Sequence, residues 1–154
     1  MPLSDNVPIV LLVHRNDDSL AIYQEFLAHK GFVPRAVSDG HEALSSARAV
    51  DIIITEIILD GDMDGFELIS RLRRDGSTKH KPIVVLTSSA WNTERQRAET
   101  AGCDLFLTKP CLPDELVREV RRLLASKSRA EARRRSAKAT LPTKTATRRN
   151  RRGR

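Results

Sequence analysis

Short apolar runs alternate with stretches of helical periodicity along the first 125 residues. The runs have strand length and cover residues 7–14, 32–37, 51–58, 82–87 and 104–108. After each run, apolar side chains recur every three or four residues, or a polar stretch of helix-forming residues follows, and both patterns predict helices. The expected helices begin near Asn16, Asp39, Asp64, Thr93 and Pro113, and Gly31, Gly76 and Gly102 stand where three of them should end.

Strands that alternate with helices form a parallel sheet covered on both faces, and three of the runs are apolar throughout, as buried strands are. The sequence therefore predicts an α/β domain over residues 7–125, with a five-stranded parallel doubly wound sheet of the flavodoxin-like type. Residues 1–6 are expected to be a short N-terminal segment that precedes the domain. In such sheets ligands bind beyond the carboxyl ends of the strands. The residues at those ends are His14, Arg15, Glu56, Thr87, Ser88 and Lys109.

The charge of the chain is unevenly distributed. Net charge is +7 over 154 residues, but residues 126–154 hold twelve Lys and Arg and only one acid, Glu131, so residues 1–125 carry a net charge of −4. The apolar pattern stops after Ser126, which predicts a disordered basic tail; residues 127–135 are good helix formers, so a longer last helix is the alternative. The arginines expected to attract anions are Arg133, Arg134, Arg135, Arg148, Arg149, Arg151 and Arg152.

Several classes of protein find no support in the sequence. No run of 18 apolar residues and no apolar leader is present, and the two cysteines lack C-x-x-C spacing, so we expect a cytoplasmic protein without a membrane span. The chain has no glycine-rich phosphate loop, no serine nucleophile elbow and no histidines at ligand spacing. We therefore expect no enzyme activity, no bound metal and no cofactor.

Three segments at the strand ends and helix starts, "LTSSA", "LTKP" and "MDGFELI", carry a family resemblance. Residues 7–125 resemble the CheY-like receiver domains of two-component response regulators. The resemblance implies a phosphorelay function in which an aspartate after the third strand takes a phosphoryl group from a histidine kinase. It also implies two acids that hold Mg²⁺, a Thr or Ser, a Lys, and a switching aromatic residue. Thr87, Lys109 and Phe106 occupy the last three positions.

The other positions depart from the family. Glu56 stands at the phosphoacceptor position, and His14 and Arg15 stand at the acid pair. An alignment that uses Asp17 and Asp18 instead would draw a polar triplet into the first strand, so we reject it. Because Mg²⁺ prefers carboxylate oxygens and in-line transfer tolerates little misplacement, the sequence predicts a phosphorylation-independent pseudo-receiver. Either Arg15 or Lys109 is expected to neutralise Glu56.

Alternatives remain for the acidic turn and for the partner. Asp60, Asp62, Asp64 and Gly65 match the first half of a calcium loop, but Arg71 occupies its last position, so an acidic turn capped by Asp64 is favoured. Asp60 as phosphoacceptor is the least favoured reading, since it lies beyond the strand end. The expected partner is a protein on the face of the fourth helix, fifth strand and fifth helix, with Trp91 as an exposed contact or a partly buried core residue. Alternatives are nonspecific nucleic-acid binding, an acidic protein or membrane surface at the tail, and a homodimer.

Overall fold

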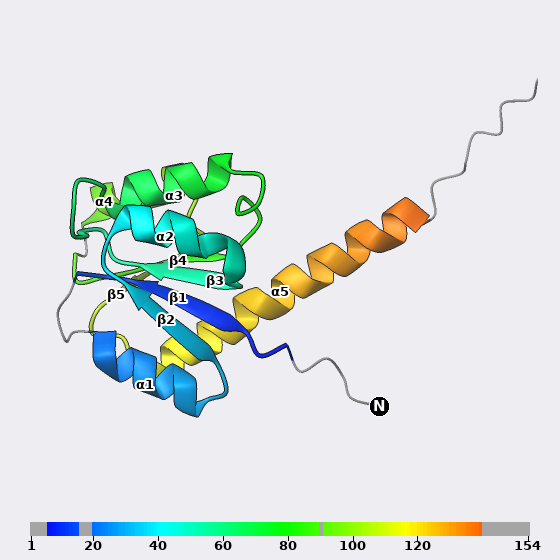
Figure 1. The fold of residues 1–154 in the computed structure, drawn as a ribbon, viewed down its shortest axis with the longest axis horizontal. Helices are drawn as coiled ribbons and strands as arrows, with labels where there is room; N and C mark the ends of the chain where they lie inside the picture. Colours follow the sequence, from blue (N-terminus) through cyan, green and yellow to red (C-terminus); the bar gives the residue numbers. More distant parts are fainter. Residues whose placement is uncertain (1–5, 16–19, 90, 140–154) are drawn as a thin grey trace, which may run out of the picture.

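Five parallel strands and the helices that cover them make up the part of the chain that the computed structural model describes, residues 6–15, 20–89 and 91–139. The strands are β1 (Ile9–Val13), β2 (Val33–Val37), β3 (Ile52–Thr55), β4 (Ile83–Thr87) and β5 (Leu105–Thr108). The helices are α1 (Ala21–His29), α2 (Gly40–Ser46), the short 3₁₀ helix η2 (Ala47–Ala49), α3 (Gly65–Arg74), α4 (Asn92–Ala101) and α5 (Pro113–Ala139). Figure 1 shows this sheet wrapped by helices. The predicted α/β fold class is confirmed.

The strand order is β2-β1-β3-β4-β5, and all pairings are parallel. The order reverses between β1 and β3, so the carboxyl ends of these two strands border the crevice in which ligands bind in doubly wound sheets. Val13 and Thr55, the last residues of the two strands, are register partners. β3 ends at Thr55 and not at residue 58 as expected, because the chain turns out of the sheet after Glu56.

Two apolar cores, one on each face of the sheet, hold the layers together. Successive side chains along each strand point to opposite faces and therefore belong to different cores. Leu11, Ile53 and Val85 point into the core shared with α2 and α3, whereas Leu12 and Ile54 point into the core shared with α1 and α5. All five of these side chains are buried. Figure 1 shows α2 and α3 on one face of the sheet, and α1 and the first part of α5 on the other.

The helix ends follow the sequence signals. The side chain of Asp39 accepts hydrogen bonds from the backbone N–H groups of the first turn of α2, and Asp64 does the same for α3. Gly102 ends α4 in the left-handed conformation, with φ of 117°. The predicted caps and the glycine stop are thus confirmed, while the cap expected near Asn16 lies outside the described residues.

The last helix corrects the prediction of a disordered tail from residue 126. α5 continues without interruption to Ala139, so the alternative of a longer last helix is the one the structure takes. Residues 126–139 are rich in Ala, Arg and Lys, and they extend a helix that is already formed, so no new nucleation is required. The tail arginines Arg148, Arg149, Arg151 and Arg152 lie outside the described residues. Within the described residues, no helix is both long and apolar enough to cross a membrane.

Candidate functional site

A cleft of about 380 Å³ opens at the carboxyl ends of the central strands. The cleft is lined by all six residues that the sequence predicts at strand ends. Four further residues also line it: two isoleucines, one serine, and one glutamate that comes from α4. The lining residues are His14, Arg15, Glu56, Ile57, Ile58, Thr87, Ser88, Ser89, Glu94 and Lys109. Parallel strands end at the same edge of the sheet, which is why segments far apart in the sequence meet here.

The sheet ladder fixes the backbone of the cleft. The N–H of Glu56 donates to the carbonyl of Val13, at 2.9 Å, and the N–H of Lys109 donates to the carbonyl of Thr87, at 2.7 Å. The N–H of His14 donates to a carbonyl of β2, at 3.0 Å. The residues that follow β1, β3 and β5 are therefore held by the last hydrogen bonds of the sheet.

Glu56 forms an ion pair with Lys109, whose Nζ donates to Oε1 of the carboxylate. The two side chains are only 16% and 19% exposed, respectively, so the pair sits largely within the protein. Arg15 lines the same cleft but is exposed, and no ion pair within the described residues joins it to Glu56. Of the two cations that the sequence offered as partners for Glu56, the structure uses Lys109.

His14 and Arg15, the described residues that follow β1, do not offer ligands for magnesium. Nδ1 of His14 lies 2.7 Å from the carbonyl oxygen of Arg15 and donates to it, so the imidazole is turned toward its own backbone. The guanidinium of Arg15 has no lone pair for a metal, and one oxygen of Glu56 is taken by Lys109. The donors described here therefore do not fit Mg²⁺. The aspartates of the rejected alignment, Asp17 and Asp18, lie outside the described residues.

Thr87, which lines the cleft, and Phe106 on β5 are both buried. Thr87 is 3% exposed, and its hydroxyl oxygen accepts a hydrogen bond from the N–H of Ser89, at 3.2 Å. Phe106 is 6% exposed, and the guanidinium carbon of Arg95 lies 5.2 Å from its ring centroid. This cation–π contact covers the aromatic ring from α4.

Glu94 is a cleft residue that the sequence analysis missed. It comes from the first turn of α4, and its Oε2 is buried without a hydrogen-bond partner among the described residues. An acid in the first turn of a helix interacts favourably with the helix dipole, so its type was unremarkable in the sequence. Its position could have been anticipated, because the helix after β4 begins at the same edge of the sheet as the strand ends.

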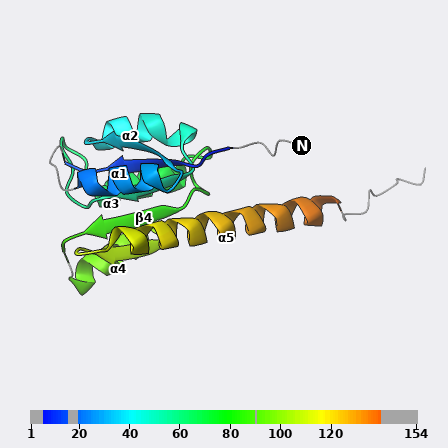
Figure 2. The same ribbon diagram turned by 90° about the horizontal axis from the view of Figure 1, so that it is seen from below.

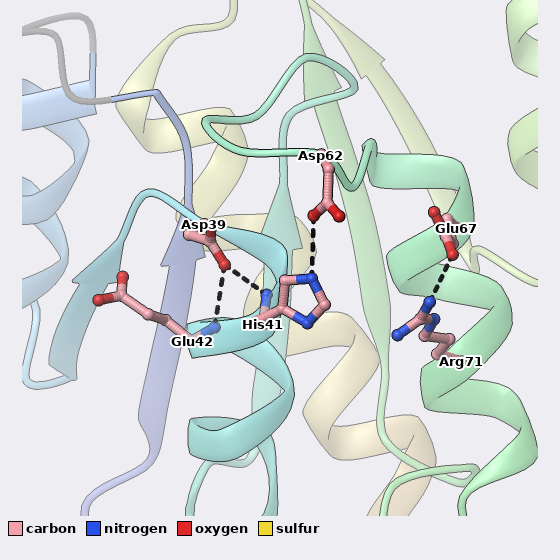
Figure 3. Close-up of polar contacts among 6 residues, drawn as sticks. All are labelled: Asp39, His41, Glu42, Asp62, Glu67 and Arg71. Carbon is pink, nitrogen blue, oxygen red and sulfur yellow. Dashed lines mark hydrogen bonds and ion pairs between the residues drawn. The ribbon is translucent and has the colours of Figure 1, made fainter.

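The acidic turn before α3 is built from local contacts, and its carboxylates have different partners. Oδ1 of Asp62 pairs with Nε2 of His41 on α2, at 3.0 Å, and this hydrogen bond lowers the pKa of Asp62 (Figure 3). The carboxylate of Asp64 instead caps α3 by accepting from the N–H of Glu67, at 2.9 Å. Among the described residues, no group of three potential ligands could hold a metal ion. Asp64 thus caps α3 in the way the sequence favours.

Known proteins resemble this chain over most of its length. The family model described as response regulator receiver domain matches residues 10–121. A protein of Porphyra purpurea, "Probable transcriptional regulator ycf29", is 32% identical over 117 residues, which cover 74% of this chain and 56% of that protein. A 14.6 kDa protein of Leptolyngbya boryana is 32% identical over 112 residues, which cover 72% of this chain and 86% of that protein.

Solved structures give the same picture. The receiver domain of the sensor histidine kinase PA1611 from Pseudomonas aeruginosa, solved with a magnesium ion in its active-site cleft, superposes with a TM-score of 0.71 at 27% identity, covering 77% of this chain and 98% of that one. The chemotaxis response regulator CheY4 of Vibrio cholerae has a TM-score of 0.67 at 29% identity, covering 77% and 99%. The chain spans about half the length of the curated relatives that it matches in Porphyra purpurea and Pyropia yezoensis.

Proposed function

The chain belongs to the response regulator receiver family of two-component signal transduction, and from this premise we propose that it is a pseudo-receiver that signals without being phosphorylated. Its role is to bind a protein partner. Receiver domains in general are signalling proteins and not enzymes, and this chain keeps their fold while replacing the groups that carry the phosphoryl chemistry. We place its action in the cytoplasm.

The observation that carries the proposal is the ion pair between Glu56 and Lys109. It occupies the position at which the family's aspartate would be phosphorylated, and it is largely buried. Phosphoryl transfer needs a metal ion to neutralise charge on the transferred group, and the cationic side chain of Arg15 and the imidazole of His14 stand where the ligands of that metal would be. On this proposal, the described residues of the pocket supply neither a correctly placed acceptor nor the means to activate it.

The negative charge of Glu56 is permanent, whereas in the family phosphorylation of the aspartate adds negative charge only when the pathway is active. A glutamate carries about one negative charge, while an aspartyl phosphate adds about −1.5 to −2 and three acceptor oxygens. A two-state element needs roughly 5.5 kcal/mol to move from 1:99 to 99:1. Because Lys109 pairs with Glu56, we do not expect this single carboxylate to provide all of that energy. The proposal therefore concerns a fixed state and does not equate Glu56 with a phosphorylated aspartate.

The surface proposed for the partner consists of α4, β5 and the first half of α5. Trp91, immediately before α4, is 73% exposed, which resolves the two readings left open by the sequence in favour of a surface position. Large exposed aromatic side chains are frequent anchors of protein interfaces. On the same surface, the guanidinium of Arg95 on α4 covers the ring of Phe106 on β5. A homodimer through the same surface is part of this proposal.

The test is a phosphorylation assay on a restored pocket. The natural protein and the variant His14→Asp/Arg15→Asp/Glu56→Asp are incubated with acetyl phosphate and Mg²⁺, and intact mass is measured. We expect no phosphoryl adduct on the natural protein and one adduct on the restored variant. A control with His14→Asp/Arg15→Asp/Glu56→Asn should remain unmodified. An adduct on the natural protein would refute the proposal.

A second candidate function is nonspecific association with nucleic acid, and the basic end of the chain favours it. The described part of that end, residues 126–139, carries six Lys and Arg against one Glu and is almost entirely exposed. Cations that meet phosphates release counterions, which makes such binding strongly dependent on salt. Salt-sensitive retardation of DNA, lost when the cations after residue 125 are replaced by Gln, tests this candidate independently of the pocket.

A further inference from the structure

The second half of α5 projects from the domain as a helix with its charges exposed. We call residues 126–139 the basic arm; at about 1.5 Å per residue it is about 21 Å long. Figures 1 and 2 show this part of α5 extending beyond the sheet. Its cations are Lys127, Arg129, Arg133, Arg134, Arg135 and Lys138, and all except the half-buried Lys127 are exposed.

The cations of the basic arm are distributed around the whole helix. At about 100° per residue, Arg129 and Arg133 share one side, Arg134 and Lys138 share a second, and Arg135 points away from both. Within the described residues, the only ion pair on the arm joins Lys127 to its single acid, at 3.8 Å. The remaining cations are exposed, but the first turns of the arm run beside the body, where Arg134 borders a pocket that it shares with His80 and Asp104.

The basic arm has no apolar face. Leu123 and Leu124 are the last leucines of α5, and beyond them the only apolar side chains are alanines. An amphipathic helix that lies on a membrane needs a broad apolar face, and a coiled coil needs an apolar seam. A flat anionic surface would also reach only one side of the helix and leave the other cations unused.

We infer that the basic arm binds in the major groove of duplex DNA as a helix. The groove is about 12 Å wide and admits a helix of about 10–12 Å diameter, and both of its walls carry phosphates. A helix in that position uses cations on more than one side, which fits the exposed positions of Arg133, Arg135 and Lys138. The deep, narrow major groove of duplex RNA does not admit it. This inference deepens the second candidate function and rests on it.

The cationic surface continues onto the domain itself. Arg118 and Arg122 precede Arg129 and Arg133 at spacings of four, seven and four residues, which keeps the four arginines on one side of α5 over about 22 Å. Both are exposed, and Arg122 also pairs with Glu119, at 2.7 Å. Bound DNA would therefore contact the receiver body as well as the arm, and hold it at a fixed angle.

The experiment measures binding of the full chain to a labelled duplex of about two helical turns by fluorescence anisotropy, at several salt concentrations. If about six phosphates are neutralised, the slope of log K against log salt is about −5, and affinity falls by about 10³ between 50 and 200 mM salt. Arg129→Gln/Arg133→Gln should reduce the steepness of the slope by about 2. The control Arg35→Gln/Arg48→Gln removes the same charge from exposed positions on the body and should leave the slope unchanged.

The helical conformation is tested by Ala130→Pro, which keeps every charge but interrupts the arm. We expect it to weaken duplex binding about tenfold or more relative to Ala130→Ser. Equal affinity of these two variants, or equal affinity for single-stranded and duplex DNA, would overturn the inference while leaving nucleic-acid association intact. No salt-sensitive binding to any DNA would overturn both. Tighter binding to phosphatidylserine vesicles than to the duplex would overturn the assignment of DNA as the ligand.

Discussion

The Glu56–Lys109 ion pair should make a measurable contribution to the stability of the domain. Exposed ion pairs contribute about 0–1 kcal/mol, whereas removing one partner of a fully buried pair costs about 3–5 kcal/mol. With side chains 16% and 19% exposed, this pair lies between these limits. We expect Lys109→Met to lower the free energy of unfolding by about 2 kcal/mol, since it leaves a partly buried carboxylate without its cation.

A double-mutant cycle isolates the pair from the other contacts of the two residues. Glu56→Gln, Lys109→Met and the double variant are unfolded in urea, and helicity is followed by circular dichroism. The double variant should lose about 2 kcal/mol and not the sum of the single losses, so the coupling energy is about 2 kcal/mol. For a domain of this size the single changes correspond to a fall in Tm of roughly 7 °C.

An exposed pair in the same domain provides the control. Glu67 and Arg71, one turn apart on α3, are paired at 2.6 Å with side chains nearly half exposed. The same cycle there should give about 0.3–0.5 kcal/mol. If the coupling between Glu56 and Lys109 is no larger than this control, the pair does not hold the pocket in a fixed state, and the argument for a permanent replacement of the switch fails.

Three further predictions concern other parts of the domain. Gly65→Ala would place a Cβ 2.3 Å from the carbonyl oxygen of Glu56, so we expect a loss of about 2 kcal/mol by urea unfolding, whereas Gly76→Ala, with nothing within 4 Å, should be nearly neutral. Burial raises the pKa of Cys103 from 9.0 to about 11, so its alkylation in the folded protein should be half-maximal near pH 11; the stability linked to this thiol is complete below pH 9 and is lost as the pH rises through 11. Lys81 donates to three backbone carbonyls in the turn before β3, at 2.6–2.8 Å, so Lys81→Met should cost about 2 kcal/mol in the same urea assay.

Much of the fold followed from local patterns. The apolar runs located all five strands, and the caps Asp39 and Asp64 and the stop at Gly102 are local signals that need no tertiary information. The cleft followed as well, because a parallel sheet brings its strand ends together. The sequence could not choose between Arg15 and Lys109 as the partner of Glu56, since both lie at strand ends and the choice depends on side-chain directions.

The differences between the sequence predictions and the structure have physical causes. The apolar stripe stops at Leu124 and therefore predicts too early an end for α5. A helix that is already formed can extend without such a stripe when its residues favour the helical state. Glu94 was missed because a first-turn acid is common and its burial is a tertiary property. The sequence predicts too long a third strand because Ile57 and Ile58 continue the apolar run, although β3 ends at Thr55.

The absence of a break in α5 has a mechanical consequence. The helix packs against the sheet at Leu116 and Val120 and then continues as the basic arm, with no hinge residue between them. A straight helix of 27 residues, about 40 Å long, transmits torque as well as position. A ligand that binds the basic arm therefore also fixes the orientation of the receiver domain. Several molecules bound along one linear ligand would present their receiver domains in a regular array.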